Sequence, residues 1–415
     1  MEDLLEDLLL GKVKLRELDS LLGNPNRAAD LRLEFLRRTA GADLKPIARS
    51  RLDFSKLVGW NIENPVGEVS IPVGVIGPLR VEGDYARGTF YPLLATTEGA
   101  LVASVNRGAT TITMAGGARA KILRDGMARA PALLAPTAAR AAEVARWVSE
   151  NLDKLQKVVE DVTSHGKLLY AQPFQAGRTL FLRFVFETGD AMGMNMVTIA
   201  SDRILGFLKK RFPDVDPLAL SGNVCSDKKA ASINWIAGRG KTVIAEAFIP
   251  GDLIESRLKT SVERLLDVAW RKNLLGAAVA GSLGGFNANV ANVVAAMFVA
   301  YGQDLAQVVE SSMGITTLEP QGDGIYISLT LPSLEVGTVG GGTRLPYARA
   351  ALSALGCVGG GDPPGVNAKK FAEIVAATAL SGELSLLASL AEGSLARSHE
   401  RLGRCGGGSR GATTF

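Results

Sequence analysis

The sequence predicts an α+β protein in which a small domain is inserted into a larger domain built around a long central helix. A glycine-rich turn at 281–285 opens into a stretch that is apolar on every face, and a helix is expected over about 288–310, roughly 34 Å long. Such a helix belongs inside a large domain. Residues 131–220 show a self-contained alternation of strands and helices. The 415 residues, 47% of them hydrophobic, suffice for two or three domains.

Charge and cysteine content exclude several classes of protein. Lys plus Arg number 46 and Asp plus Glu 42, and the net charge of +4 is spread along the chain, so no nucleic-acid partner is expected. Cys225, Cys357 and Cys405 are odd in number and lack ligand-like spacing, which favours a reducing compartment over a disulfide or metal framework. Residues 1–10 are acidic and no apolar run reaches about 18 residues, so we expect a cytoplasmic protein without a membrane segment.

Residues 1–58 predict an N-terminal helical segment, in which short amphipathic helices are broken at 23–25. From Ile62 onward, glycine and proline punctuate β-branched residues, which predicts tight turns and strands close to a ligand or to another chain. Thr97 is a candidate N-cap for a helix that carries Glu98 in its first turn. The helix dipole favours a carboxylate there, so capping alone would explain Glu98.

The inserted domain is predicted from the order strand, helix, strand, strand, helix, strand. This βαββαβ order is the ferredoxin-like arrangement, and its size suits an insert. The large domain comprises 59–130 and 221–400 and contains a further helix at 367–390, and residues 401–415 form a flexible tail. The elements expected in the insert are strands at 132–135, 167–174, 179–187 and 218–220 and helices at 137–161 and 194–211.

Two ionisable residues stand out by position. Asp304 leaves the predicted central helix on an apolar stripe, so its carboxylate should be buried and should have a partner or a raised pKa. A structural ion pair would explain it equally well. His399 lies at the edge of the glycine-rich tail, which suits a general acid that closes over a ligand, although a lone surface histidine is usually incidental. The adjacent charges 227–229 usually mark a solvated turn.

The glycine-rich pieces at 116–117, 340–342 and 359–361 match neither a Rossmann turn nor a P-loop. The segment GDAMGMN, residues 189–195, is the better candidate for a nucleotide. It lies between a strand and a helix, where glycine backbone can approach a flat ring and the helix N-terminus attracts phosphate.

Six blocks together resemble one family. They are ENPVGEVSIPVG, TTEGALVASVNRG, GDAMGMNM, SGNVCSDKKAASINWIAGRGK, GGFNANVANVVAAMFVAYGQDLAQVV and SLEVGTVGGGT, and they extend from about Ile62 to His399. The sequence is similar to 3-hydroxy-3-methylglutaryl-coenzyme A (HMG-CoA) reductases of class I, in the soluble archaeal-type form. The resemblance implies reduction of HMG-CoA to mevalonate with two NADPH, without a metal, by a homodimer or dimer of dimers with active sites at the subunit interface.

The resemblance also implies catalytic roles. Glu98 would be the acid that protonates the carbonyl oxygen, Lys228 would stabilise the oxyanion, and Asp304 would couple to both. A Glu beside an Asp retains one proton, which lets Glu98 act as an acid near neutral pH. His399 would protonate the departing coenzyme A thiolate, since an imidazolium gives its proton to a thiolate downhill.

Binding roles follow from the same resemblance. The segment 163–167 departs from the family's pattern, because relatives often have an arginine there that meets the 2′-phosphate of NADPH. In this sequence His165 or Lys167 would take the place of that arginine. Cys405 stands where some animal relatives carry a phosphorylatable serine, so regulation by that switch is not expected. Asn292 would be a substrate-binding residue that joins the network of Glu98, Lys228 and Asp304. The other implied ligands are Arg129, Ser221, Asp227 and Lys229 for the hydroxymethylglutaryl end, Ser104, Asn106, Arg107 and Ser398 for coenzyme A, and Asp190, Met192, Gly193, Met194, Asn195, Ser164, His165, Lys167, Gly340, Gly341 and Gly342 for NADPH.

Two other functions use the same residues. A coenzyme A thioester hydrolase or transferase could employ the Glu, Lys and His without a hydride. A non-enzymatic acyl-CoA binder is the third possibility, and a buried Asp304 would argue against it.

Overall fold

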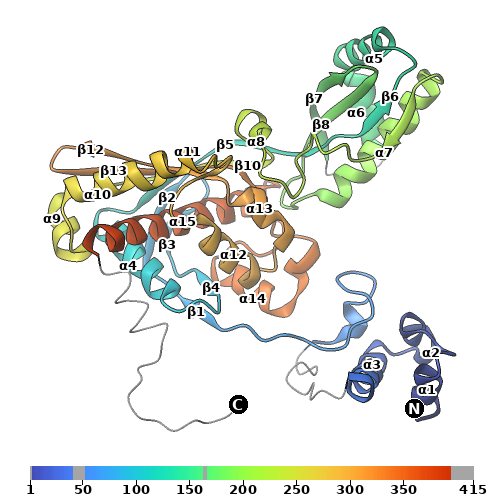
Figure 1. Cartoon of the computed structure of the whole chain (residues 1–415), viewed down its shortest axis with the longest axis horizontal. Coiled ribbons are helices and arrows are strands. Elements are labelled where there is room, and N and C mark those ends of the chain that lie inside the picture. The colour runs from blue at the N-terminus through green and yellow to red at the C-terminus, as the bar shows by residue number, and fades with distance from the viewer. Residues whose placement is uncertain (1, 41–51, 162–165, 394–415) are drawn as a thin grey trace. The chain divides into compact units, whose positions relative to one another are not determined.

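The computed structural model describes residues 2–40, 52–161 and 166–393, which form helices and sheets in two compact units within 1–72 and 73–415 (Figure 1). The first unit is a small helical core around Leu5, Leu18 and Leu31. As expected, its helices break at 23–25, where Gly23 adopts a left-handed conformation. Its elements are α1 (Glu2–Leu9), η1 (Leu15–Glu17), α2 (Leu18–Leu22), α3 (Pro25–Ala40) and η3 (Phe54–Lys56).

The second unit contains a large, mostly antiparallel sheet. Its strands lie in the order β11, β12, β13, β10, β5, and β2 pairs with β5 and with β3. A separate pair, β1 and β4, lies apart from this sheet. The strands are β1 (Val73–Val75), β2 (Leu79–Gly83), β3 (Arg87–Phe90), β4 (Leu93–Ala95), β5 (Ala118–Arg129), β10 (Gly240–Ile249), β11 (Gly285–Phe286), β12 (Gly314–Gln321) and β13 (Gly324–Leu334).

The longest helix, α15 (Val366–Glu392), confirms the expected helix at 367–390 and lies in the centre of this core (Figure 1, red). It packs against β10 and β5 on one side and against α4 (Leu101–Met114) and α12 (Val290–Ala300) on the other. Its length and apolar composition would allow it to cross a membrane, but 89% of its most apolar window is buried inside the protein. Because most of this window is buried, α15 is a core helix of the protein.

The helix expected over 288–310 is wrong in length, because α12 ends at Ala300. Gly302 follows with φ +64°, and a Cβ on it would lie 2.4 Å from the carbonyl oxygen of Gly342. The chain turns there and resumes in short helices. The helices not yet named are α8 (Ser232–Ala237), α9 (Gly251–Leu253), η4 (Ile254–Leu258), α10 (Val262–Ala269), η5 (Trp270–Gly276), α11 (Ala277–Val279), η6 (Leu305–Gln307), α13 (Val308–Ser311), η7 (Gly341–Arg344) and α14 (Pro346–Ala354).

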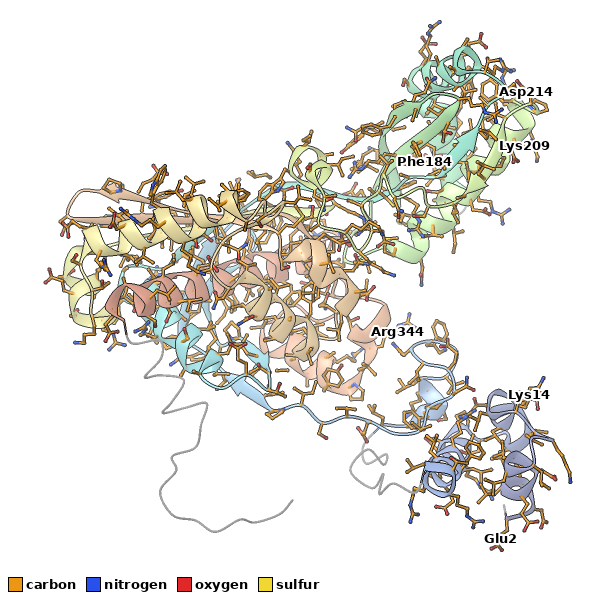
Figure 2. The ribbon with its side chains drawn as sticks, viewed as in Figure 1. Glu2, Lys14, Phe184, Lys209, Asp214 and Arg344 are labelled. Atoms are coloured by element: carbon orange, nitrogen blue, oxygen red, sulfur yellow. The ribbon has the colours of Figure 1, made fainter. Side chains whose placement is uncertain are left out.

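A second hydrophobic core forms between residues 127 and 215 around an antiparallel sheet with strand order β9, β6, β8, β7. Phe184 lies inside this core and Asp214 at its surface (Figure 2). The single helix expected at 137–161 is instead two, because Asn151 leaves the helical conformation. The elements are β6 (Ala132–Leu134), α5 (Ala138–Glu150), α6 (Leu152–Glu160), β7 (Lys167–Ala176), β8 (Thr179–Glu187), α7 (Met194–Arg211) and β9 (Asp216–Ala219).

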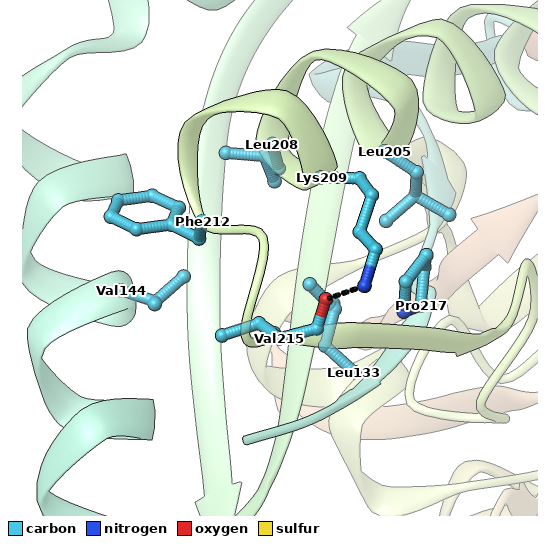
Figure 3. Close-up of a pocket in the computed structure, with 8 residues that line it drawn as sticks. All are labelled: Leu133, Val144, Leu205, Leu208, Lys209, Phe212, Val215 and Pro217. Atoms are coloured by element: carbon cyan, nitrogen blue, oxygen red, sulfur yellow. Dashed lines mark hydrogen bonds between the residues drawn. The ribbon is translucent and has the colours of Figure 1, made fainter. Parts of the chain in front are cut away.

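The space between α7 and the sheet is filled by side chains such as Leu133, Leu208 and Phe212 (Figure 3). Lys209 lies at its edge and donates to the carbonyl oxygen of Val215 at 3.0 Å. A water molecule has no room there, so this pocket is core and not a ligand site.

Strand β5 connects the two sheets without a break. Residues 119–126 pair with β10 in the large sheet, and residues 127–129 pair with β8 in the small one. The last residue of β5, Arg129, therefore lies where the two sheets meet.

Candidate active site

The loop 221–229 contains three predicted ligands, Ser221, Asp227 and Lys229, and the predicted catalytic residue Lys228. Asn223, Ser226 and Lys228 all have left-handed backbone, with φ of 65°, 57° and 60°. Such conformations are uncommon for residues other than glycine, so neighbouring contacts must hold the loop. The buried Ser226 hydroxyl is hydrogen-bonded to Asn234 Oδ1 and to the carbonyl oxygen of Cys225. The predicted ligand Ser221 also lies here, 3.4 Å from the sulfur of Cys225.

Among the three adjacent charged residues 227–229, Asp227 is the one held by several contacts. Its carboxylate lies 3.2 Å from Arg129 and 3.2 Å from Arg239, and it accepts a hydrogen bond of 3.0 Å from Gln307. Burial works to raise the pKa of this carboxyl, but the Gln307 hydrogen bond and the surrounding positive charges, Arg239 first, hold the pKa below its ordinary value. Asp227 is therefore an anion that orders cations around it.

The side chains of Lys228 and Lys229 are exposed. Lys229 Nζ donates to the carbonyl oxygen of Asp227 at 3.2 Å. Among the described residues no side-chain hydrogen bond or ion pair engages the Lys228 ammonium group, which leaves it available to a ligand.

Arg239 lies at the centre of the site, and the sequence reasoning missed it. Its guanidinium is fully buried and reaches Glu310 at 2.8 Å, Gln307 at 3.0 Å and Glu335 at hydrogen-bonding distance. It also reaches Met194 Sδ at 2.7 Å, in one of the predicted cofactor segments. The available signal was local: Arg239 immediately precedes the buried strand β10 and lies between Gly238 and Gly240, where flanking side chains are absent.

Three carboxylates face this buried centre. Asp227, Glu310 and Glu335 surround Arg239, and Arg129 also contacts Asp227. Burial raises the pKa of Glu335 well above its ordinary value, against the attraction of Arg239, and burial also raises the pKa of Glu310. Among the described residues, Oε2 of each glutamate is buried without another hydrogen-bond partner, and a proton retained by one of the pair would relieve this.

Asp304 departs from the prediction. It is exposed, and its side chain caps η6 by accepting a hydrogen bond of 3.1 Å from the amide of Ala306. The expected burial is wrong for the single chain, because α12 ends before Asp304 and the carboxylate leaves from a turn. Gln307 Nε2 lies 3.5 Å from Asp304 Oδ2 and 3.0 Å from Asp227 Oδ1, so Gln307 links Asp304 to the charged loop.

Glu98 lies in a loop before α4, not in the first turn of a helix. Helix α4 begins at Leu101 and its N-cap is Ala100, so the expected N-cap at Thr97 is wrong. Asn292 donates to both Glu98 oxygens, at 2.8 and 3.1 Å. Within the described chain, no hydrogen bond joins Glu98 to Asp304 or Lys228, so the coupling of these three groups stays a prediction.

The residues expected to face coenzyme A lie on α4, against the C-terminal half of α15. Arg107 donates to Ser389 at 2.6 Å and to the carbonyl oxygen of Ser385 at 2.5 Å, and Ser104 contacts Ser385 at 3.0 Å. Burial lowers the pKa of Arg107 below its usual range, although the guanidinium remains partly exposed. Asn106 accepts a hydrogen bond from the amide of Gly77.

An open hollow lies near the same end of α15. It has about 460 Å³ of space and was not anticipated from the sequence. Its cations would attract the phosphates of a nucleotide-bearing ligand. The lining residues are Arg264, Asp267, Val268, Arg271, Lys272 and Leu390.

The two expected cofactor segments lie side by side. Ala191 forms a β-bridge with Val339, and the amides of Thr338 and Val339 donate to the carbonyl oxygen of Asp190. Thus the segment 190–195 and the glycines 340–342 belong to one region. Met192 lies two residues before α7, and Asn195 lies in the first turn of this helix.

Glycine is required in this region. Gly193 precedes α7 with φ +95°, and a Cβ there would lie 2.3 Å from Thr188 Cγ2. Gly340 and Gly341 also have positive φ, and a Cβ on either would meet open space. Gly193 is the N-cap of α7, and because glycine has no side chain it does not cap the amides of the first turn. This combination of open backbone and a helix N-terminus fits a nucleotide.

Four predicted site residues, Ser164, His165, Ser398 and His399, lie outside the described residues. Lys167 is described and is the exposed first residue of β7. Over the described ranges, no group of three or more His, Cys, Asp or Glu side chains could hold a metal ion.

Known proteins resemble this chain closely. A family model described as hydroxymethylglutaryl-coenzyme A reductase matches residues 28–404. The 3-hydroxy-3-methylglutaryl-coenzyme A reductase of Aeropyrum pernix is 56% identical over 98% of this chain and 96% of its own length. That of Pyrococcus abyssi is also 56% identical, over 97% of this chain and 100% of its own. Reductase 1 of Oryza sativa subsp. japonica is 48% identical over 96% of this chain and 75% of its own.

The fold is shared with more distant solved structures. The class II 3-hydroxy-3-methylglutaryl-CoA reductase from Streptococcus pneumoniae bound to NADPH superposes with a TM-score of 0.63. It is 18% identical and covers 86% of this chain and 96% of its own.

Proposed function

The chain belongs to the hydroxymethylglutaryl-coenzyme A reductase family, and from this premise we propose how its residues reduce HMG-CoA to mevalonate and coenzyme A with two NADPH. One observation carries the proposal. Arg239 contacts both Asp227, beside the exposed Lys228, and Met194, which lies in the cofactor segment 190–195 and begins α7. Substrate and hydride donor would therefore meet around one buried cation.

The hydroxymethylglutaryl group binds at the charged loop. Arg129 and Lys229 meet its carboxylate, with Ser221 and Asp227 as hydrogen-bonding partners. Lys228 places its ammonium group at the thioester carbonyl, where negative charge develops during hydride addition. Glu98, held by Asn292, donates the proton to that oxygen, and Asp304 completes this acid when the site is assembled.

Coenzyme A binds at the C-terminal end of α15. Ser104, Asn106 and Arg107 lie along its path, and the hollow with Arg264, Arg271 and Lys272 receives its phosphates. Ser398 and His399 follow α15 in the sequence, so they are tethered to this end. His399 protonates the thiolate as coenzyme A departs.

NADPH supplies the hydride when it is bound. Residues 131–220, with their βαββαβ order and antiparallel strand order β9, β6, β8, β7, act as a ferredoxin-like cofactor domain. The residues that would hold NADPH are those of 190–195 and 340–342, with Ser164, His165 and Lys167 at the 2′-phosphate. The DAMGMNM and DKK blocks support class I in the soluble archaeal-type form.

We also propose a cytoplasmic homo-oligomer, a dimer or a dimer of dimers, with its active sites at the subunit interface. Glu98, Lys228 and Asp304 are all exposed in the single chain, whereas hydride and proton transfer require that water be excluded. Large apolar side chains near these segments are exposed as well: Ile236 by 74%, Leu305 by 54% and Val309 by 45%. A second copy would cover both sets of residues.

The test follows NADPH absorbance and thiol release together in the purified protein with HMG-CoA. The reductase consumes two NADPH for each thiol released. Thiol release without loss of NADPH would identify a hydrolase or transferase instead, and binding of HMG-CoA without either signal would identify an acyl-CoA binder.

A further inference from the structure

The main chain of Lys228 is held by a buried side chain from a distant element. Its backbone amide donates a hydrogen bond of 2.8 Å to Oε1 of Glu310, which lies in α13, 82 residues further along the chain. In the part of the chain that the structure describes, this is the one hydrogen bond that Lys228 makes. The position of its ammonium group therefore depends on where Glu310 holds the backbone.

The backbone at Lys228 needs such support. Its φ of +60° is left-handed, a conformation that is strained for a residue other than glycine. Glu310 is itself fixed, because it is fully buried and the same Oε1 atom accepts a hydrogen bond of 2.8 Å from Arg239. Arg239 is fully buried too, so the chain of contacts is rigid.

We propose that Glu310, oriented by Arg239, is a positioning residue that fixes the left-handed turn at Lys228 and so places the Lys228 ammonium group in the active site. The inference rests on the proposed role of Lys228 in oxyanion stabilisation. Glu310 itself touches neither substrate nor cofactor in this scheme. Its contribution is the position of one hydrogen-bond acceptor.

The charges around Glu310 make an informative substitution possible. Among the described residues, the ion pairs of Asp227, Glu310 and Glu335 are with the guanidinium groups of Arg129 and Arg239. In Glu310→Gln, the amide oxygen can still accept from Lys228, while Glu335 can ionise to balance Arg239. In Glu310→Asp, the charge remains but the acceptor is withdrawn by one methylene. The pair thus separates the position of the acceptor from its charge.

The experiment measures kcat for HMG-CoA reduction on folded protein of each variant. Displacing a catalytic group by about 1 Å can cost about a hundredfold, so Glu310→Ala and Glu310→Asp should lower kcat by about tenfold to a hundredfold. Glu310→Gln should recover most of the parent rate. The reverse order, with Asp active and Gln impaired, would overturn the proposal because charge would then matter and not the acceptor.

A double-mutant cycle tests whether Glu310 acts through Lys228. In a Lys228→Ala background, Glu310→Asp should lower the residual rate by less than about twofold, because the group that it positions is gone. The same factor in both backgrounds would overturn the proposal. If Lys228→Ala itself leaves turnover near the parent value, Lys228 does not stabilise the oxyanion and the proposed mechanism is wrong. This result is distinct from equal factors in the two backgrounds, which would overturn only the positioning role of Glu310.

Glu373 offers a matched control for loss of a buried carboxylate. It is also fully buried and accepts hydrogen bonds from the amides of Asp84, Tyr85 and Ala86, far from the charged loop in sequence. Glu373→Gln should change the melting temperature more than kcat. An equal loss of kcat in Glu373→Gln and Glu310→Asp would mean that buried carboxylates act on the fold alone, and would overturn the positioning role.

Discussion

The carboxylate of Asp190 accepts a hydrogen bond of 2.7 Å from the backbone amide of Gly365, the residue that precedes α15. The amides of Gly361 and Ala368 donate to the same carboxylate at 2.8 and 2.9 Å. A residue of the expected cofactor segment thus caps the longest core helix, where the helix dipole favours negative charge. Asp190 positions its segment and stabilises α15, and its oxygens are already occupied.

Asp190→Ala should therefore lower the free energy of unfolding by about 2–4 kcal/mol, because three backbone amides, two of them in buried hydrogen bonds, lose their acceptor. Asp190→Asn keeps one acceptor oxygen and should cost less. Chemical denaturation of both variants measures this, with Asp202→Ala on the exposed face of α7 as the control. Equal stability of Asp190→Ala and Asp202→Ala would show that the cap contributes nothing.

Lys228→Ala should reduce turnover by about a hundredfold or more while the melting temperature stays near that of the parent. The ammonium group is exposed, so its loss leaves the core intact, and one preorganised donor to an oxyanion has about this value. Steady-state kinetics with HMG-CoA and a melting curve decide it. Turnover within a few-fold of the parent would remove Lys228 from the mechanism.

His399→Gln should nearly abolish reduction of the thioester and leave reduction of supplied mevaldehyde largely intact. Only the first of the two hydride transfers is followed by departure of a thiolate, which needs a proton that an imidazole can supply near neutral pH. NADPH oxidation is measured with each substrate in turn, and Lys228→Ala should impair both. Equal losses with the two substrates would contradict the proton-donor role.

NADPH should give a higher kcat/KM than NADH, because a cation at the 2′-phosphate favours the charged cofactor. Lys167 is the described candidate, exposed at the start of β7. Lys167→Ala should lower kcat/KM for NADPH by about tenfold and leave NADH nearly unaffected, since a charged hydrogen bond contributes about 1.5–3 kcal/mol. A parent enzyme that uses both cofactors equally would contradict the expected specificity.

Glu335→Gln should make stability less dependent on pH. Burial raises the pKa of Glu335 well above 4.5, so the folded protein keeps a proton that the unfolded chain loses above about that pH. The folded state is therefore destabilised progressively as pH rises from there towards the folded-state pKa, and glutamine removes this term. The melting temperature of the variant relative to the parent should rise by about 2 °C or more between about pH 5 and about pH 8. A constant difference would place the retained proton elsewhere.

Local pattern was enough for much of the secondary structure. The strands at 167–176 and 179–187 and the helices at 194–211 and 366–392 lie close to their expected ranges, because alternating or helical spacing of apolar residues marks them directly. The structure also brings segments of different motif blocks together: it joins 190–195 to 339 and the charged loop to Gln307.

Tertiary contacts decided the rest. The apolar run after 288 continues a helical pattern, yet α12 ends at Ala300 because the backbone of Gly302 packs against Gly342, and this exposes Asp304. Arg239 could not be recognised as the centre of the site, since its partners Glu310 and Glu335 lie 71 and 96 residues away. Sequence periodicity reports which face of an element is apolar, but a buried charge is stabilised by whichever distant groups the fold brings to it.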